Sequence, residues 1–123
     1  MSNIRFRVWC KNKNQWEVDD IFLTDKGELW HQEKPWRSAP LRLEYHAIQF
    51  FTGLTDKNEK RIYEGDIVKV FNREYDDEPN RNEVIFKGGA YRYSDGKAND
   101  VPCGYYKPSE VEVVGNIFEG LTT

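Results

Sequence analysis

The chain has 123 residues, a net charge of −3 at pH 7 and 38% apolar residues, enough for one compact domain or two small lobes. The apolar residues fall in organised runs, which excludes a wholly disordered protein. No basic excess marks a nucleic-acid-binding face, and no signal peptide or run of about 18 apolar residues marks an export or membrane segment. We therefore expect a cytoplasmic protein.

The N-terminal region is predicted to form short antiparallel strands. Apolar and basic residues alternate over residues 4–8, which is the period of a half-buried strand. A polar turn at 11–14 separates this strand from its expected partner within residues 16–23. A second turn signal at 25–27 precedes a third short strand at 28–31.

Residues 32–51 do not follow one clear period. Pro35 and Pro40 predict a loop, because proline lacks an amide donor and is excluded from central strands. Residues 41–51 fit both a strand and one face of a helix, and the aromatic content of 45–51 favours a strand. The fold class is therefore expected to be mainly β, with α+β as the alternative if 41–51 is helical.

The stretch from 56 to 70 carries the clearest local signal. A polar turn leads to Gly65, which can adopt positive φ, and to Asp66, which can hydrogen-bond the backbone of its own corner. The β-branched residues at 67–70 suit a buried strand. Glu64 and Asp66 form a carboxylate pair in an alternative metal or acid–base interpretation, but such a site needs further ligands. We favour the structural corner.

The remaining strands are expected around two long loops, at 73–82 and 94–104. Strands at 83–86 and 90–93 are joined by a Gly-Gly turn. Gly115 interrupts the last apolar run and predicts a bulge or bend. This spacing of short strands is typical of a small barrel.

These elements predict a two-lobed β protein. A short-stranded N-terminal sheet in a lobe of residues 1–54 is expected to pack on a C-terminal SH3-like small barrel in a lobe of residues 55–123. The two lobes are expected to form one compact unit.

No constellation of side chains indicates catalysis. Cys10 and Cys103 are far apart and are expected to be reduced thiols; a zinc site or disulfide, with His31 and His46 as further ligands, is the alternative. The acids at 76–78 lack the spacing of a Ca²⁺ loop and are expected to be solvated. We therefore assign no catalytic, metal or cofactor residue and expect a protein that is not an enzyme.

One group of aromatic and basic residues is a candidate binding surface. On a small barrel such residues can stack on bases and contact phosphates. In the alternative interpretation one face of these strands is core, and acidic neighbours weaken the case for nucleic acid. The group is Tyr91, Arg92, Tyr93, Tyr105, Tyr106 and Lys107.

Three blocks of sequence resemble the YopX family of phage and prophage proteins. They are Arg-Phe-Arg-Val-Trp at 5–9, the long block at 49–68, and Glu-Val-Val-Gly-Asn-Ile-Phe-Glu at 112–119. Two positions depart from the family pattern: Cys10 stands where Asp is frequent, and Glu59 where Gly is frequent. The residues that carry the resemblance as structural motifs are Thr52, Gly53, Leu54, Asp56, Asn58, Tyr63, Glu64, Gly65, Asp66, Gly115 and Asn116.

The resemblance implies a phage or prophage accessory protein, made in the bacterial cytoplasm and oligomeric. It supplies no catalytic residues and no cofactor. The leading hypothesis is a non-catalytic module that binds a host or phage protein, or itself, through aromatic surface and strand edges. The alternatives are an SH3-like module for nucleic acid and, third, a metal-dependent enzyme using Glu64, Asp66 and the acids at 76–78.

Overall fold

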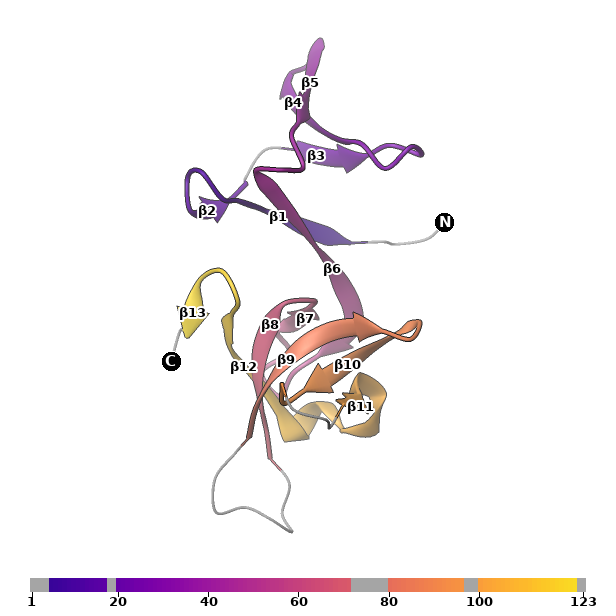
Figure 1. Cartoon of the computed structure of the whole chain (residues 1–123), viewed down its shortest axis with the longest axis vertical. Coiled ribbons are helices and arrows are strands. Elements are labelled where there is room, and N and C mark those ends of the chain that lie inside the picture. Colours follow the sequence, from indigo (N-terminus) through magenta and orange to yellow (C-terminus); the bar gives the residue numbers. More distant parts are fainter. Residues whose placement is uncertain (1–4, 18–19, 72–79, 97–99, 122–123) are drawn as a thin grey trace. The chain divides into compact units, whose positions relative to one another are not determined.

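The computed structural model of the protein describes residues 5–17, 20–71, 80–96 and 100–121. The chain divides into two compact units, a smaller unit of residues 7–48 and a larger unit that contains residues 5–6 and everything described from Gln49 onward. The smaller unit is thus inserted in the sequence of the larger one. The described residues contain strands and two 3-10 turns but no α-helix (Figure 1), so the expected mainly β class is confirmed and the α+β alternative is not.

The smaller unit begins with the predicted hairpin. β1 (Phe6–Cys10) and β2 (Gln15–Trp16) are antiparallel, with Trp9 opposite Trp16. The indole rings of these two residues meet edge to face with centroids 5.0 Å apart, and the Arg7 guanidinium lies 4.2 Å from the Trp16 ring. Aromatic contacts of this kind stabilise a strand pair that is too short to bury much surface.

A three-stranded antiparallel sheet completes the smaller unit. Its order is β3 (Asp20–Leu23), β4 (Leu29–Lys34) and β5 (Arg37–Leu41). The loop predicted around Pro35 and Pro40 is therefore wrong, because strands β4 and β5 occupy this region. Pro35 lies in the short turn between the two strands, and Pro40 lies opposite Trp30 on an edge strand. An edge position needs no ladder donor on its outer side, so proline is tolerated there. The partner expected within residues 16–23 is also divided: β2 pairs with β1, whereas β3 pairs with β4.

The larger unit is built on a curled six-stranded antiparallel sheet (Figure 1). Its order along the sheet is β11-β10-β9-β8-β12-β13, so the last long strand of the chain lies beside an early one. The strands are β8 (Asp66–Val70), β9 (Asn80–Lys87), β10 (Ala90–Ser94), β11 (Asp100–Pro102), β12 (Val111–Asn116) and β13 (Gly120–Leu121).

Two further strands and two 3-10 turns complete this unit. β6 (His46–Thr55) pairs over its second half with β7 (Arg61–Tyr63). The turns η1 (Cys103–Tyr105) and η2 (Pro108–Glu110) connect β11 to β12. The region expected as a loop at 94–104 contains β11, a strand of three residues that is too short to show a hydrophobic period.

The core of the larger unit follows the strand alternation. In β8 every second residue is buried, and β9, β10 and β12 add residues from their inward faces. The predicted Gly-Gly turn joins β9 to β10, with Lys87 opposite Ala90. The buried cluster is Ile62, Val68, Val70, Val84, Tyr93, Cys103, Val111 and Val113.

Gly115 lies at the irregularity that its position in the sequence indicates. The register between β12 and β8 shifts between Val113 and Gly115, which is a β-bulge. A Cβ atom at Gly115 would collide with the backbone carbonyl of Gly120 in the neighbouring strand β13. Close approach of two backbones therefore requires glycine here.

The corner at 65–66 joins β7 to β8. Gly65 has φ of +88°, and a Cβ atom there would collide with the side-chain amide of Gln49. The buried Asp66 carboxylate accepts a hydrogen bond from the Tyr63 amide at 2.8 Å and one from the Asn116 side chain at 3.0 Å. The Asn116 amide also donates to Gln49 Oε1 at 2.9 Å, so this network spans much of the sequence.

Candidate functional site

An apolar groove of about 660 Å³ opens within the larger unit. Strand β6 supplies four consecutive lining residues, the β7–β8 corner supplies one, and the β9–β10 hairpin supplies two. Four of the seven side chains are aromatic and one is a carboxylic acid. The lining residues are Phe50, Phe51, Thr52, Gly53, Glu64, Phe86 and Tyr91.

The first wall of the groove depends on an irregularity in β6. Its register against β7 shifts between Phe51 and Thr55, and Gly53 has φ of +90°. The Thr52 hydroxyl donates to the backbone carbonyl of Ile62 at 2.7 Å, which fixes the bulged segment to β7. A bulge re-aims the side chains around it. The local sequence thus sets the direction of this wall.

The two phenylalanines of this wall are supported by different rings. The Phe50 ring has its centroid 6.1 Å from that of Phe6, and the Phe51 ring has its centroid 5.6 Å from that of Tyr63. The Arg61 guanidinium lies 5.6 Å from the Phe51 centroid. This distance is within the range of a cation–π contact, so a ring that lines the groove already attracts a cation of its own chain.

The second wall is the β9–β10 hairpin. Phe86 and Tyr91 lie opposite each other, and their rings meet edge to face with centroids 5.0 Å apart. Phe86 is 55% exposed. A large aromatic side chain held this far out of the core, next to a partly buried one, is apolar surface available to a ligand.

Glu64 is the only lining residue with an acidic carboxyl group. Its amide donates to the Phe50 carbonyl at 2.9 Å, and the amide of Gly65 donates to the Val84 carbonyl at 2.8 Å, so backbone bonds fix its position. Burial raises the pKa of this carboxyl above its usual value of 4.5. Burial raises the pKa of Tyr91 as well, and the charge of Glu64 adds to that shift. The two groups therefore interact within the groove.

The groove has the chemistry of a receptor for a cation. Aromatic faces carry negative potential, and a carboxylate beside them adds a full negative charge. The lining residues include no histidine, cysteine or lysine, and the Thr52 hydroxyl is engaged as a donor. They therefore offer no activated nucleophile, and Glu64 and Tyr91 are the ionisable groups among them.

The residues selected from the sequence as a binding surface are not all brought to one surface. Tyr93 is 2% exposed and belongs to the core, where burial and the neighbouring Cys103 raise its pKa. Tyr106 is half-buried against the same core, with its ring centroid 6.1 Å from that of Tyr93. Burial raises the pKa of the Cys103 thiol to about 12. Tyr93 and Cys103 thus belong to the buried cluster of the larger unit, and Tyr106 packs against that cluster.

The other members of that group have separate environments. Tyr105 is 74% exposed and meets Tyr106 edge to face, with centroids 5.1 Å apart. The Arg92 Nε donates to the Lys87 carbonyl at 3.1 Å within the hairpin. Lys107 is exposed, and its amide donates to a side-chain oxygen of Glu110. Tyr91 alone among the six lines the groove.

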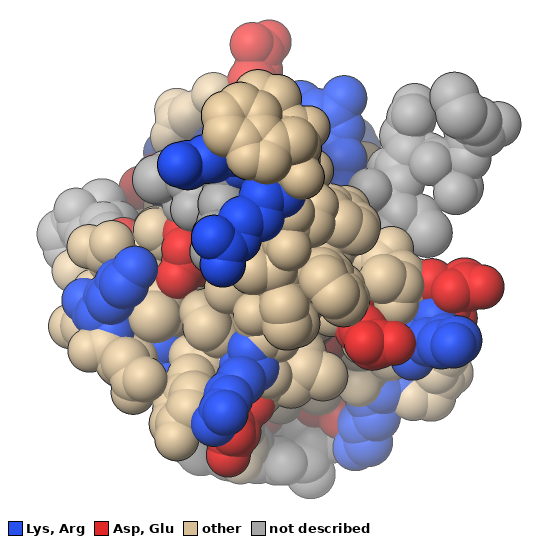
Figure 2. Space-filling view, turned by 90° about the horizontal axis from the view of Figure 1, so that it is seen from above, with Lys and Arg blue, Asp and Glu red and all other residues tan. Residues whose placement is uncertain are grey.

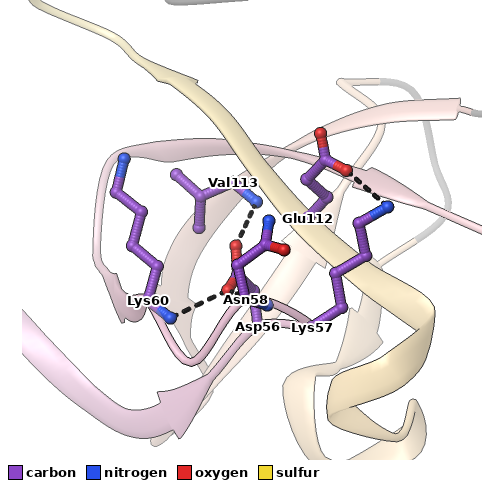
Figure 3. A network of polar contacts seen from close by, with 6 residues as sticks. All are labelled: Asp56, Lys57, Asn58, Lys60, Glu112 and Val113. Atoms are coloured by element: carbon purple, nitrogen blue, oxygen red, sulfur yellow. Dashed lines mark hydrogen bonds and ion pairs between the residues drawn. The ribbon is translucent and has the colours of Figure 1, made fainter.

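Asp56 organises the long family block (Figure 3). Its buried carboxylate accepts the amides of Asn58 and Lys60 through Oδ1, each at 2.9 Å. Its Oδ2 accepts the amide of Val113 in β12, also at 2.9 Å. The adjacent Lys57 forms an ion pair with Glu112 at 2.7 Å. This network connects the 56–60 turn to the last long strand and serves the fold.

The carboxylates considered for a metal-dependent enzyme serve separate roles. Glu64 lines the groove, whereas Asp66 is engaged in the corner network. The acids at 76–78 lie outside the described residues. Within the parts of the chain that the structure describes, the one cluster of at least three ligand-type side chains is Cys10, Glu17 and His46, in the smaller unit.

Charged side chains of both signs are interspersed on the face shown in Figure 2. Among the described residues of that face, Lys and Arg do not merge into a continuous basic area. A nucleic-acid-binding face is expected to gather such residues.

Sequence reasoning did not single out Phe50, Phe51 and Phe86. Their alternation with neighbouring residues is equally typical of core positions. One signal was available: adjacent Phe50 and Phe51 cannot face the same side of a regular strand, and Thr-Gly follows them at a position typical of a bulge.

The family model described as YopX protein matches residues 5–120. Two solved structures share the fold. The structure of yopX from Bacillus subtilis matches with a TM-score of 0.66 and 20% sequence identity, over 96% of this chain and 94% of that chain. The structure of EF1440 from Enterococcus faecalis matches with a TM-score of 0.61 and 20% sequence identity, over 96% of this chain and 95% of that chain. No curated protein matches the chain. None of the described helical segments is long and apolar enough to cross a membrane.

Proposed function

Because the chain belongs to the YopX family, we propose that it is a non-catalytic accessory protein of a phage or prophage that acts as a protein-interaction module. Its groove in the larger unit receives a segment of a host or phage protein. That segment carries an arginine or lysine flanked by apolar residues. The bacterial cytoplasm is the proposed compartment, and the SH3-like comparison for the larger unit stays a prediction.

One observation carries the proposal: a groove of about 660 Å³ whose lining combines four aromatic rings with the single carboxyl group of Glu64. Rings and carboxylate together favour a cationic side chain over a neutral or anionic one. The volume exceeds what one side chain fills and falls in the range of ordinary ligand sites, so flanking apolar residues of the partner are expected to enter as well.

A protein partner is favoured over nucleic acid by the same chemistry. Glu64 and Tyr91 are the ionisable lining residues, and neither supplies a positive charge for phosphate. The aromatic group selected from the sequence includes Tyr93, which is buried. Base stacking by that residue would require the core to open.

The experiment is selection from a randomised pentapeptide library whose central position is fixed as Arg, Lys, Gln or Glu. We expect the wild-type protein to retain peptides centred on Arg or Lys, with apolar neighbours. Retention should increase as pH rises through the raised pKa of Glu64, above about 4.5, because only the ionised carboxylate attracts the cation.

Three variants locate the binding site. Glu64→Gln should remove the preference for a basic centre, and Phe86→Ala should weaken retention of all peptides. The matched control is Glu83→Gln, which removes an exposed carboxylate on the same strand as Phe86 but outside the groove. Equal retention of all four libraries, or a loss caused equally by Glu83→Gln, would refute the proposal.

Self-association is the second part of the proposal. The smaller unit exposes large apolar side chains, with Phe22 and Leu23 on edge strand β3 and Trp36 in the β4–β5 turn, 78% exposed. Exposed edges with apolar side chains are surfaces for strand pairing between chains. Light scattering after size exclusion should give more than one chain per particle, and a strict monomer at high concentration would contradict it.

A further inference from the structure

Three side chains with ligand atoms gather in the smaller unit. The Sγ of Cys10, a carboxylate oxygen of Glu17 and a ring nitrogen of His46 all lie within 4.8 Å of one another. Cys10 is buried, and the side chains of His46 and Glu17 are 11% and 9% exposed. A thiol, an imidazole and a carboxyl group thus share a nearly dry site, which is unusual for groups that are strongly hydrated when exposed.

Backbone bonds fix all three positions. Cys10 and Glu17 lie on one face of the β1–β2 hairpin, because Cys10 is opposite Gln15 and the Glu17 amide donates to the Val8 carbonyl at 2.9 Å. The amide of Lys11, next to Cys10, donates at 2.8 Å to the carbonyl of the residue before His46. The ligand atoms are therefore brought together by the hairpin and by the start of β6.

The ring of His46 is oriented as in a metal ligand. Its Nδ1 lies 2.8 Å from the Arg42 carbonyl, so Nδ1–H donates there. Its Nε2 then faces Glu17 Oε1 at 3.3 Å. An imidazole that donates from Nδ1 turns the lone pair of its Nε2 toward Glu17, where a metal ion can accept it. A carbonyl acceptor on the far nitrogen is the usual outer partner of a metal-bound histidine.

We propose that this site binds one Zn²⁺ ion through Cys10 Sγ, Glu17 carboxylate and His46 Nε2. Zinc accepts sulfur, nitrogen and oxygen ligands together at about 2.0–2.3 Å in a tetrahedron, which sets ligand atoms roughly 3.3–3.8 Å apart. The 3.3 Å between Nε2 and Oε1 already meets that spacing. The thiolate also favours zinc over magnesium or calcium, which prefer oxygen ligands.

Three protein ligands leave one tetrahedral position for water. The ion would connect the two strands of the first hairpin with β6, adding a link between residues 10, 17 and 46 that the sparse core of the smaller unit does not provide. Binding that requires the folded arrangement stabilises the folded state. The proposal concerns the smaller unit and does not depend on the groove.

The test uses the full-length chain without an affinity tag, stripped of metal with a chelator. Addition of Co²⁺ should produce a thiolate-to-cobalt charge-transfer band that saturates at one equivalent, and Zn²⁺ should abolish it. In ¹⁵N-histidine spectra, Zn²⁺ should shift Nε2 of His46, leave its Nδ1 protonated and leave His31 unchanged. Absence of saturation at one equivalent, or a shift at His31 instead, would overturn the proposal.

Variants with matched controls separate ligands from bystanders. Cys10→Ser, Glu17→Gln and His46→Gln should each weaken zinc binding by at least about 100-fold, the upper end of what loss of an outer-shell partner costs. Cys103→Ala and His31→Gln change the other cysteine and the other histidine and should bind as the wild type does. Wild-type affinity in Cys10→Ser would refute the site. If a ligand variant fails to fold, the histidine spectra of the wild type decide alone.

Discussion

The two units of the chain are stabilised by different means. The larger unit has a continuous buried cluster and two buried polar networks, around Asp56 and around Asp66. In the described part of the smaller unit the buried residues are Val8, Trp9, Cys10 and Leu29, while Trp36 and Leu43 are more than half exposed. The larger unit resembles an ordinary small domain in this respect, and the smaller one leaves apolar surface for a partner, a second chain or a metal to compensate.

The four tryptophans allow the two units to be followed separately. Trp9, Trp16, Trp30 and Trp36 all belong to the smaller unit, so indole fluorescence reports its unfolding. Chemical shifts of β8 and β12 report the larger unit. Each variant below is expected to act on one of these signals more than on the other.

The largest effect is expected from Asp56→Ala. It removes the acceptor of three backbone amides, one of them in β12, and leaves buried donors unsatisfied. We expect the unfolding free energy of the larger unit to fall by about 4 kcal/mol, measured from β8 and β12 in denaturant. Lys60→Ala is the control, because Lys60 contributes its backbone amide and its side chain is exposed. A loss below about 1 kcal/mol would contradict this role.

Leu29→Ala tests the smaller unit. Leu29 is 1% exposed and is among the largest fully buried side chains of the protein. The cavity should cost about 3 kcal/mol and shift the tryptophan transition. Leu43→Ala, at a position that is 52% exposed, should shift it much less. If both variants have equal effects, the smaller unit has no specific core at Leu29.

Glu59→Gly should stabilise the larger unit. Glu59 has φ of +62°, a conformation that costs a non-glycine residue about 1 kcal/mol and that glycine adopts freely. The matched change in the smaller unit is Asn14→Gly, at φ of +54°, where the gain should be smaller because asparagine tolerates this region. Thermal unfolding of both variants measures the difference, and a lower melting temperature for Glu59→Gly would contradict it.

The smallest effect is the pH dependence of Glu64. Burial raises its pKa in the folded state above 4.5, so the folded state holds this proton more tightly than the unfolded state does. The carboxyl therefore lowers stability as pH rises through the window from 4.5 to the raised value, and has no effect well below it. Glu64→Gln should become relatively more stable across that window. A difference that does not vary with pH would show that the groove does not desolvate this group.

The sequence was sufficient where local rules act alone. Alternation and turn residues predicted the first hairpin, the Gly-Gly turn and the bulge at Gly115. It was insufficient where the outcome depends on strand order. Pro40 is excluded from a central strand but not from the edge position that it occupies, and the sequence does not show which strand is an edge.

The groove was not predictable from the same rules. Tyr91 and Tyr93 were both selected as surface residues. They are two positions apart on β10, so they lie on the same face of the strand and alternation does not distinguish them. Tyr91 lines the groove, whereas Tyr93 is in the core. How deeply each residue of the strand is buried depends on packing along the curled sheet. Glu59 was predictable from the sequence. It stands where the family frequently has glycine, and its backbone adopts the positive φ that a glycine at that position indicates.

The place of β12 in the sheet has a consequence for synthesis on the ribosome. This strand lies between β8 and β13. Its Val113 amide donates to Asp56, and its Asn116 side chain donates to Asp66 and Gln49, residues that are 50 to 67 positions earlier in the chain than their partners. Asp56 and Asp66 accept amides of their own turns, but their contacts with β12 form only after that strand has left the exit tunnel. The sheet of the larger unit is therefore incomplete until β12 has been made, and a nascent chain that stalls before residue 111 exposes the β8 edge to other chains.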